Sequence, residues 1–179
     1  MTHRDSHSAR PCTFCDLIKG SAEVSVCYED PDAIAFMDIQ PVNPGHVLVV
    51  PRAHYESFLD VPPELGVHLF RVTMRLAGAV RRVIRSDDLN IVVNSGAAAG
   101  QDEPHYHVHI IPRRPHDGFD IPLPFPDSVM PDRTMLDAVA VRIIAELRDP
   151  MRIEGNPQRR ASDLQASDTA DRPAEVSQT

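Results

Sequence analysis

The sequence predicts an α+β fold with a mostly antiparallel sheet and two main helices. Two observations indicate this class. Apolar runs of strand length, bounded by Pro, Gly, Asn and Asp, occur before and after one long amphipathic segment, and a second amphipathic segment follows them. Hairpin-like strands, a helix, further strands and a terminal helix form the order that is typical of α+β domains.

The length of 179 residues fits one domain with tails. Residues 1–11 are polar and are predicted to be a disordered leader, residues 12–148 a folded domain, and residues 149–179 a disordered tail. The leader lacks the apolar run of a secretory signal, and no segment reaches the ~18 consecutive apolar residues of a membrane span. We therefore expect a cytoplasmic protein without a membrane partner.

The formal net charge of the chain is −8. General nucleic-acid binders present a basic stripe, so this charge argues against that class of protein. It does not exclude single nucleotides, which a local site can bind whatever the charge of the whole chain.

The first three strands lie in the N-terminal third. Residues 26–29 and 33–38 read as two strands joined by the turn Asp30-Pro31-Asp32. A second turn covers residues 41–45, and the apolar run 46–50 is the third strand.

The long amphipathic segment begins at Pro62-Pro63-Glu64, where proline and an acidic residue suit a first helical turn. His68 lies beside its apolar stripe and is predicted to be at the surface. A second helix is expected at residues 134–148, after a proline-rich, irregular stretch at 112–131. The two apolar faces consist of Leu65, Leu69, Val72, Leu76, Ala79 and Val83, and of Met135, Val139, Ile143 and Leu147.

A strand at residues 89–94 and a small-residue loop at 95–100 precede the stretch His105-Tyr106-His107-Val108-His109-Ile110-Ile111-Pro112. Its three histidines occupy alternate positions, and alternate residues of a strand share a face. The histidines then face one side, while Tyr106, Val108 and Ile110 face a core. Pro112 has no N–H for a ladder and suits the strand's end.

Such a row of imidazoles can bind a metal, titrate near neutral pH or attack an electrophile. Same-face neighbours lie roughly 6.5–7 Å apart, so one zinc ion can be chelated by two adjacent members and not easily by all three. At least one histidine should therefore face something else. The alternative is a solvated polar face on an edge strand.

Cys12-Thr13-Phe14-Cys15 is half of a zinc site, whose other two ligands must come from elsewhere in the chain. The alternative is a redox dithiol, which requires a neighbouring strand and an exposed thiol of low pKa at a helix start. No clear strand precedes the motif. Cys27, between Val26 and Tyr28, is predicted to be a buried packing residue.

Together these residues resemble the histidine triad (HIT) nucleotide hydrolases and transferases. The resemblance implies a HIT-like fold over residues 12–148, with a five-stranded sheet, and a homodimer. It is carried by the histidine stretch and, in order, by Cys12-Thr13-Phe14-Cys15, Ala35-Phe36-Met37-Asp38-Ile39, Pro44-Gly45-His46-Val47-Leu48-Val49-Val50-Pro51-Arg52, Val93-Asn94-Ser95-Gly96 and Gly100-Gln101.

The resemblance also implies roles for the histidines. His107 would be the nucleophile that forms a nucleotidyl intermediate, and His109 would donate a hydrogen bond to a phosphate oxygen. His105 would either support the nucleophile or ligate a structural zinc ion. The zinc set would be Cys12, Cys15, His54 and His105, with no cofactor required for catalysis. His46 would pack near the triad.

For the substrate, the resemblance implies a purine nucleotide or dinucleotide. Asp38 would accept hydrogen bonds from the ribose hydroxyls, and Asn94 and Gln101 would donate to phosphate or leaving group, together with His107 and His109. One departure is that Asp102, followed by Glu103, stands where many family members have Ser or Thr. Two carboxylates there would repel an anionic leaving group, unless they turn to solvent or Arg113 and Arg114 counterbalance them.

The activity that the resemblance implies is hydrolysis at the α-phosphate of a nucleoside phosphoramidate or a (di)nucleoside polyphosphate. A nucleotidyltransferase or phosphorylase, and a nucleotide-binding module of low activity, stay open as alternatives. A cupin-type metal enzyme using His105 and His107 as ligands is disfavoured, because the glutamate expected a few residues downstream is missing.

Overall fold

The computed structural model describes residues 12–121 and 130–148. The chain divides into two compact units, residues 1–126 and 127–179, and each is described by itself. The predicted leader and tail fall outside the described residues, as do residues 122–129 of the predicted irregular stretch.

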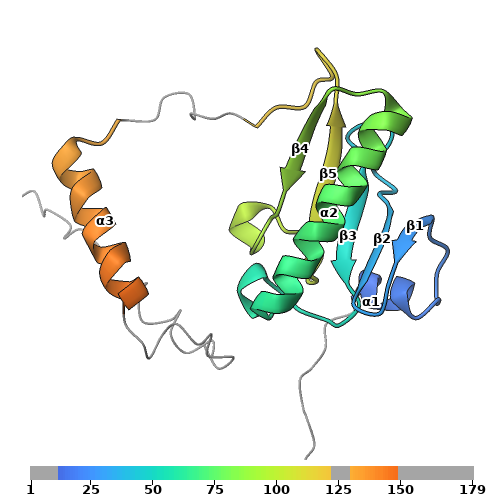
Figure 1. Cartoon of the computed structure of the whole chain (residues 1–179), viewed down its shortest axis with the longest axis horizontal. Coiled ribbons are helices and arrows are strands. Elements are labelled where there is room, and N and C mark those ends of the chain that lie inside the picture. The colour runs from blue at the N-terminus through green and yellow to red at the C-terminus, as the bar shows by residue number, and fades with distance from the viewer. Residues whose placement is uncertain (1–11, 122–129, 149–179) are drawn as a thin grey trace, which may run out of the picture. The chain divides into compact units, whose positions relative to one another are not determined.

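The first unit holds a five-stranded sheet, as the family resemblance implies, in the order β1-β2-β3-β5-β4 (Figure 1). Every neighbouring pair is antiparallel. The strands are β1 (Val26–Glu29), β2 (Ala33–Met37), β3 (Val47–Pro51), β4 (Asp88–Val92) and β5 (Val108–Arg113).

Helix α2 (Pro63–Ile84) lies across one face of the sheet, against β3, β4 and β5 (Figure 1). Its buried Leu69, Val72 and Val80 close a core on that face. Tyr106, Val108 and Ile110 belong to this core, which confirms the side predicted for them.

A second apolar cluster holds the short helix α1 (Thr13–Ile18) to other residues of β2 and β3. Cys12 caps α1, since its sulfur accepts a hydrogen bond from the Cys15 N–H. Phe14 packs edge-on to Phe36 of β2, with ring centroids 5.4 Å apart. The sequence analysis missed α1, because one and a half turns are too short to show helical periodicity.

Two predictions about β5 and β1 are wrong. Strand β5 begins at Val108 rather than at His105, and it continues past Pro112 to Arg113. Pro112 pairs only with β4, because the pairing of β5 with β3 ends at Ile110. Cys27 is exposed rather than buried, because β1 is an edge strand.

His68 is half-buried and bonds Asp30, with 2.8 Å between its Nε2 and the carboxylate, so the predicted surface position is correct only in part. Two short 3-10 turns, Phe58–Asp60 and Ala97–Ala99, complete the first unit. The second unit holds helix α3 (Arg133–Arg148), whose residues are all exposed. In the two described ranges, no helix is both long and apolar enough to cross a membrane.

Candidate active site and metal centre

The three alternating histidines do not form the evenly spaced row that the sequence predicts. Loop contacts rather than a strand ladder hold residues 105–107: the His105 N–H donates to the Glu103 carbonyl at 2.8 Å, and the Tyr106 N–H to the Tyr55 carbonyl at 2.6 Å. The rings of His107 and His109 lie together, with centroids 4.7 Å apart. The ring of His105 joins a separate group of side chains.

His107 is buried, and one of its two ring nitrogens makes a hydrogen bond to the backbone. Its Nδ1 lies 2.7 Å from the carbonyl oxygen of His105. A carbonyl only accepts, so Nδ1 carries the proton of the neutral ring and Nε2 carries the lone pair. The ring of Phe14 stands edge-on to it at 5.2 Å and limits its orientation. Nε2 is therefore the ring nitrogen whose lone pair is free to bond.

His109 is the end of a hydrogen-bonded chain. Its Nδ1 lies 3.0 Å from Nε2 of the buried His46. The other nitrogen of His46, Nδ1, lies 3.3 Å from both the backbone nitrogen of Val42 and the Asp38 carboxylate. His46 thus links Asp38 to His109 through opposite ring nitrogens.

The two contacts at Nδ1 of His46 require opposite tautomers, because the Val42 N–H donates and the Asp38 carboxylate accepts. Asp38 also accepts from the Gln40 N–H at 2.8 Å and is partly open to solvent, whereas the Val42 N–H has no other partner among the described residues. An unpaired amide is costly, so we assign the proton of His46 to Nε2. His109 then accepts at Nδ1 and presents an Nε2–H.

Burial holds the neutral form of these rings. It lowers the pKa of His109 to about 4; the neighbouring His107 and His46 lower it further, while Asp38 and Asp102 act in the opposite direction. Burial also lowers the pKa of His46. His109 is therefore an uncharged hydrogen-bond donor at neutral pH.

Asp38, His46 and His109 bring their donor atoms within 4.8 Å of one another, which is close enough for a metal ion. Asp38 and His109, however, address nitrogens on opposite sides of the His46 ring. A single ion could not replace both contacts, so the arrangement fits a hydrogen-bonded chain better than a chelate.

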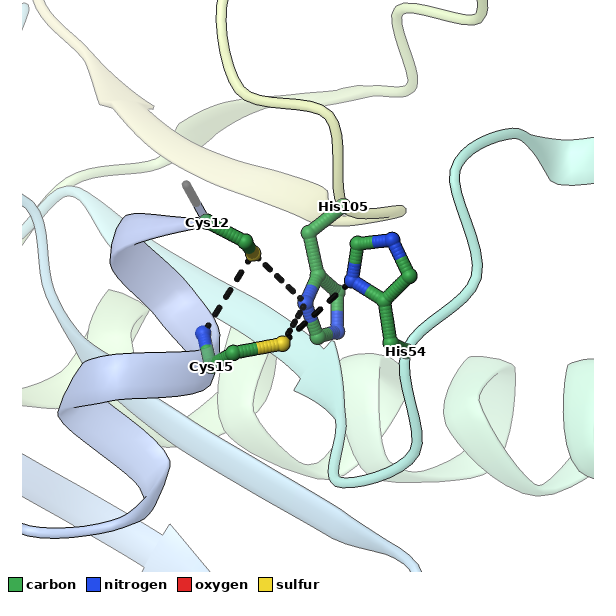
Figure 2. Close-up of side chains that lie close together, drawn as sticks. All are labelled: Cys12, Cys15, His54 and His105. Atoms are coloured by element: carbon green, nitrogen blue, oxygen red, sulfur yellow. Dashed lines mark hydrogen bonds between the residues drawn. The ribbon is translucent and has the colours of Figure 1, made fainter. Parts of the chain in front are cut away.

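The second group consists of Cys12, Cys15, His54 and His105, whose donor atoms also lie within 4.8 Å of one another (Figure 2). The Cys12 and Cys15 sulfurs lie 3.4 and 3.6 Å from Nδ1 of His105, and the Cys15 sulfur lies 3.3 Å from Nδ1 of His54. A tetrahedral zinc ion with Zn–S of about 2.3 Å and Zn–N of about 2.0 Å places its sulfur and nitrogen ligands about 3.5 Å apart. The four residues fit zinc.

The tautomer of His105 also fits. Its Nε2 lies 2.9 Å from the Pro51 carbonyl and must donate, which leaves the Nδ1 lone pair facing the sulfurs. Four protein donors complete a tetrahedron and leave no open position, as in structural zinc sites. Because the His105 carbonyl oxygen also accepts from Nδ1 of His107, the group is joined directly to His107.

The redox alternative for the cysteine pair is disfavoured. In the metal-free protein, burial, followed by the hydrogen bond with Cys12, raises the pKa of the Cys15 thiol to about 11. A reactive dithiol needs a lowered pKa instead. The cupin alternative also fails, because His105 and His107 bond different partners rather than a common centre.

Similarity to known proteins identifies the family of this chain. The model of the HIT domain matches residues 19–116. The chain belongs to the HIT family of nucleotide-binding proteins. Its fold matches the crystal structure of SMU.412c from Streptococcus mutans, with a TM-score of 0.72 and 34% identity over 82% of this chain and 91% of that one.

Two further relatives bear on the chemistry. A zinc-bound histidine triad family protein from Mycobacterium smegmatis has a TM-score of 0.58 and 33% identity, over 75% of this chain and 96% of that one. Adenylylsulfatase HINT3 of Arabidopsis thaliana is 36% identical over 106 residues, which are 59% of this chain and 54% of that one.

The residues predicted to contact a nucleotide in this HIT domain differ in how many of their polar side-chain atoms are already hydrogen-bonded. Asp38 lines a cavity of about 710 Å³ together with Val24, Met37 and Ile39. Gln101, in contrast, is fully engaged: its Nε2 donates to the Glu56 and Glu103 carbonyls at 2.6 and 2.9 Å, and its Oε1 accepts from the Gly96 N–H at 2.7 Å. In this structure Gln101 fastens the loop instead of offering its amide to a ligand.

Among the described residues, the Asn94 side chain makes one long hydrogen bond, 3.3 Å from its Nδ2 to the Gly100 carbonyl, and no other described residue bonds its amide. Arg113 does not counterbalance Asp102, because Asp117 binds its guanidinium at 2.7 and 2.8 Å. It also lies four residues along β5 from His109, roughly 13 Å away.

Sequence reasoning missed the Val42 N–H and Phe14 as parts of this HIT site. A backbone amide leaves no trace in residue type, and Phe14 reads as an ordinary core residue. A cavity of about 870 Å³ lies on the α2 side of the sheet, the face that Tyr106 and Val108 share. It is lined by apolar residues such as Phe58, Phe70, Ile91 and Val108.

Proposed function

We propose that this HIT protein is a nucleotide hydrolase that acts at an α-phosphate through a covalent nucleotidyl intermediate on His107. The hydrogen bond from Nδ1 of His107 to the His105 carbonyl carries the proposal, because it fixes the tautomer with a free Nε2 lone pair. A buried imidazole in this state serves as a nucleophile without first losing a proton.

In the first step the Nε2 lone pair of His107 forms a bond to the α-phosphorus. The bond from phosphorus to the leaving group breaks, and its electron pair departs with that group, which takes up any proton it needs from solvent. In the second step the oxygen of a water molecule bonds to phosphorus. The phosphorus–nitrogen bond then breaks, His107 recovers its lone pair, and one proton passes to solvent.

His109 would stabilise the charge that develops on the phosphoryl oxygens. Its Nε2–H is the donor at the free end of the chain from Val42 through His46. Because the pKa of His109 is about 4, this donor keeps one protonation state across the neutral pH range.

We further propose that Cys12, Cys15, His54 and His105 hold a structural zinc ion. The sulfur–nitrogen distances of 3.3–3.6 Å support this, as does the tautomer that Pro51 imposes on His105. Zinc bound there would contribute folding energy and fix His105, and the chemical step would not pass through the metal.

The nucleoside of the substrate, which we take to be a purine nucleotide or dinucleotide, would sit beside Asp38. The carboxylate would accept from the ribose hydroxyls, and the base would occupy the adjoining cavity, where Ile39 is 90% exposed. Asn94 is the remaining amide with capacity for the phosphate. For Gln101 to contribute, it would first have to release the loop.

A homodimer would cover the apolar cavity between α2 and β4. Val67, Phe70 and Ile91 are exposed there, and β4 is an edge strand with unpaired backbone groups. Size-exclusion chromatography with light scattering tests this, and a monomer would refute it.

The activity is tested with a panel of adenosine 5′-phosphoramidate, adenosine 5′-phosphosulfate and a diadenosine polyphosphate, followed by chromatography of the released AMP. We expect turnover of at least one compound by the wild type and loss of at least ~100-fold with His107→Ala. His116→Asn is the matched control, because His116 is exposed and outside both histidine groups. Transfer of the nucleotide to added phosphate instead of water would identify a phosphorylase. Equal rates for His107→Ala and wild type would refute the nucleophile.

A further inference from the structure

The turn that precedes β3 is tied to the C-terminal end of β5 by one side chain. Asn43 lies in this turn, and its Nδ2 donates to the Pro112 carbonyl at 2.9 Å and to Oδ2 of Asp117 at 2.8 Å. These bonds join residues that are 69 and 74 positions apart in the sequence. A side-chain amide nitrogen carries two hydrogens, so Asn43 uses its full donor capacity to hold the turn against β5.

Asp117 is a firm anchor for that amide. Its side chain is only 6% exposed, and it accepts from the Arg113 guanidinium at 2.7 and 2.8 Å. The N–H groups of Arg114 and Phe119 also donate to it, each at 3.1 Å. These hydrogen bonds, that of Arg113 above all, hold the pKa of Asp117 well below its ordinary value. The carboxylate therefore stays charged and keeps its orientation.

The turn that Asn43 ties down also holds the backbone and the ring of His46. The His46 N–H donates to the Asn43 carbonyl at 3.1 Å, and the Val42 N–H lies 3.3 Å from Nδ1 of the ring. The Asp38 carboxylate lies at the same distance, 3.3 Å, from that nitrogen. Val42 and Asp38 thus compete for one atom, and a small movement of the turn decides which of them bonds it.

The group that bonds Nδ1 of His46 sets the direction of the hydrogen bond to His109. When the Val42 N–H bonds it, the proton of His46 is on Nε2, and His109 accepts that proton at its Nδ1, 3.0 Å away, and presents an Nε2–H. If the turn withdrew, Asp38 would draw the proton of His46 to Nδ1, and His109 would donate from its own Nδ1. Its Nε2 would then carry a lone pair, which repels a phosphate oxygen.

We propose that Asn43, anchored by Asp117, positions the Val42 N–H and thereby selects the His46 tautomer that makes His109 a hydrogen-bond donor. Asn43 is a positioning residue, because it acts through the backbone of Val42 and the ring of His46. The use of that donor in the reaction rests on the proposed function. The tautomer itself is a property of the protein without substrate, so it can be measured independently.

The test reads the tautomers directly. Two-dimensional NMR of the ring nitrogens is recorded on the full chain at neutral pH without substrate, since the ¹⁵N shift distinguishes a protonated from an unprotonated ring nitrogen. The signals are assigned with His46→Asn and His109→Asn. The values of kcat and KM for AMP formation are then measured on the same preparations.

Three variants are compared with the wild type. Asn43→Ala removes both bonds that hold the turn, whereas Asp117→Asn keeps the size of the anchor and removes its charge. Asn90→Ala is the matched control, because Asn90 lies on β4 and its side chain accepts from the same Arg113 guanidinium rather than from the turn. A merely structural role for the network would lower stability in all three variants and leave the tautomers unchanged.

We expect the wild type to carry its ring protons on Nε2 of both His46 and His109. In Asn43→Ala both protons should move to Nδ1. The variant's kcat should fall at least ~10-fold with KM within about twofold, because the lost donor serves charge that develops in the transition state. Asp117→Asn should show a mixture of tautomers and a smaller loss of kcat, and Asn90→Ala should match the wild type in both.

Wild-type tautomers in a folded Asn43→Ala, or a proton on Nδ1 of His46 in the wild type, would overturn the inference. If Asn43→Ala does not fold, the spectrum of Asp117→Asn decides, and unchanged tautomers there would overturn it. A tautomer change in a protein that turns over no nucleotide would support the positioning role and refute the hydrolase proposal, so the two can fail separately.

Discussion

Replacing Cys12 by serine should remove zinc from this HIT domain and lower its thermal stability. Cys12 is buried, and its sulfur both caps α1 and lies 3.4 Å from Nδ1 of His105. A ligand that binds only the folded state stabilises it by about 2.7 kcal/mol when free ligand is 100 times its Kd. For a unit of this size that corresponds to a midpoint shift of about 10 °C.

The assay is a thermal melt in a zinc buffer and in a chelator, together with elemental analysis of the purified protein. The wild type should carry about one zinc ion per chain. Its melting midpoint should be about 10 °C higher in the zinc buffer than in the chelator. Cys12→Ser should lose both properties. Cys27→Ser is the matched control, because Cys27 is exposed and outside the group. If Cys12→Ser kept its zinc-dependent shift, the ligand assignment would be wrong.

Three further perturbations test other parts of the account. Asp38→Asn should raise KM about tenfold, which corresponds to the free energy of one hydrogen bond to a charged group. A 2′-deoxy substrate should bind the wild type more weakly than the parent substrate does, and this difference should vanish in the variant. An equal loss of affinity in both proteins would exclude the ribose contact. Because the pKa of His109 is lowered to about 4 from an ordinary value of 6.5, the unfolded chain takes up its proton first as pH falls. Stability should therefore be lost between pH 6.5 and 4, and His109→Asn should flatten that pH dependence in denaturant titrations. Leu69→Ala, at a side chain with 0% exposure, should cost about 3 kcal/mol in urea unfolding, whereas a cost below about 1 kcal/mol would show that the site collapses around the cavity.

The sequence predicted which residues of the sheet face the core, because side chains alternate between the two faces wherever a strand begins or ends. Tyr106, Val108 and Ile110 face the α2 core as predicted, although β5 begins at Val108 rather than at His105. The strand's start depends on contacts with Tyr55 and Glu103, which are distant in sequence or lie in a loop, and no local pattern encodes them.

The residues of the candidate site could be predicted from the sequence, but the hydrogen bonds between them could not. The two cysteines, His54 and His105 do meet, as the family resemblance implied. That His46 bridges Asp38 and His109 through opposite nitrogens depends on ring orientation, which residue spacing does not determine. The engagement of Gln101 by the Glu56 carbonyl depends on how two loops pack.

The most direct measurement is the mass of the protein during turnover. The wild type, mixed with excess adenosine 5′-phosphoramidate and quenched within milliseconds to seconds, should gain the mass of one adenylyl group, and peptide sequencing should place that group on His107. His107→Ala should gain none. An adduct on His109 or another residue, or turnover with no adduct at any quench time while water alone attacks the phosphorus, would contradict the account.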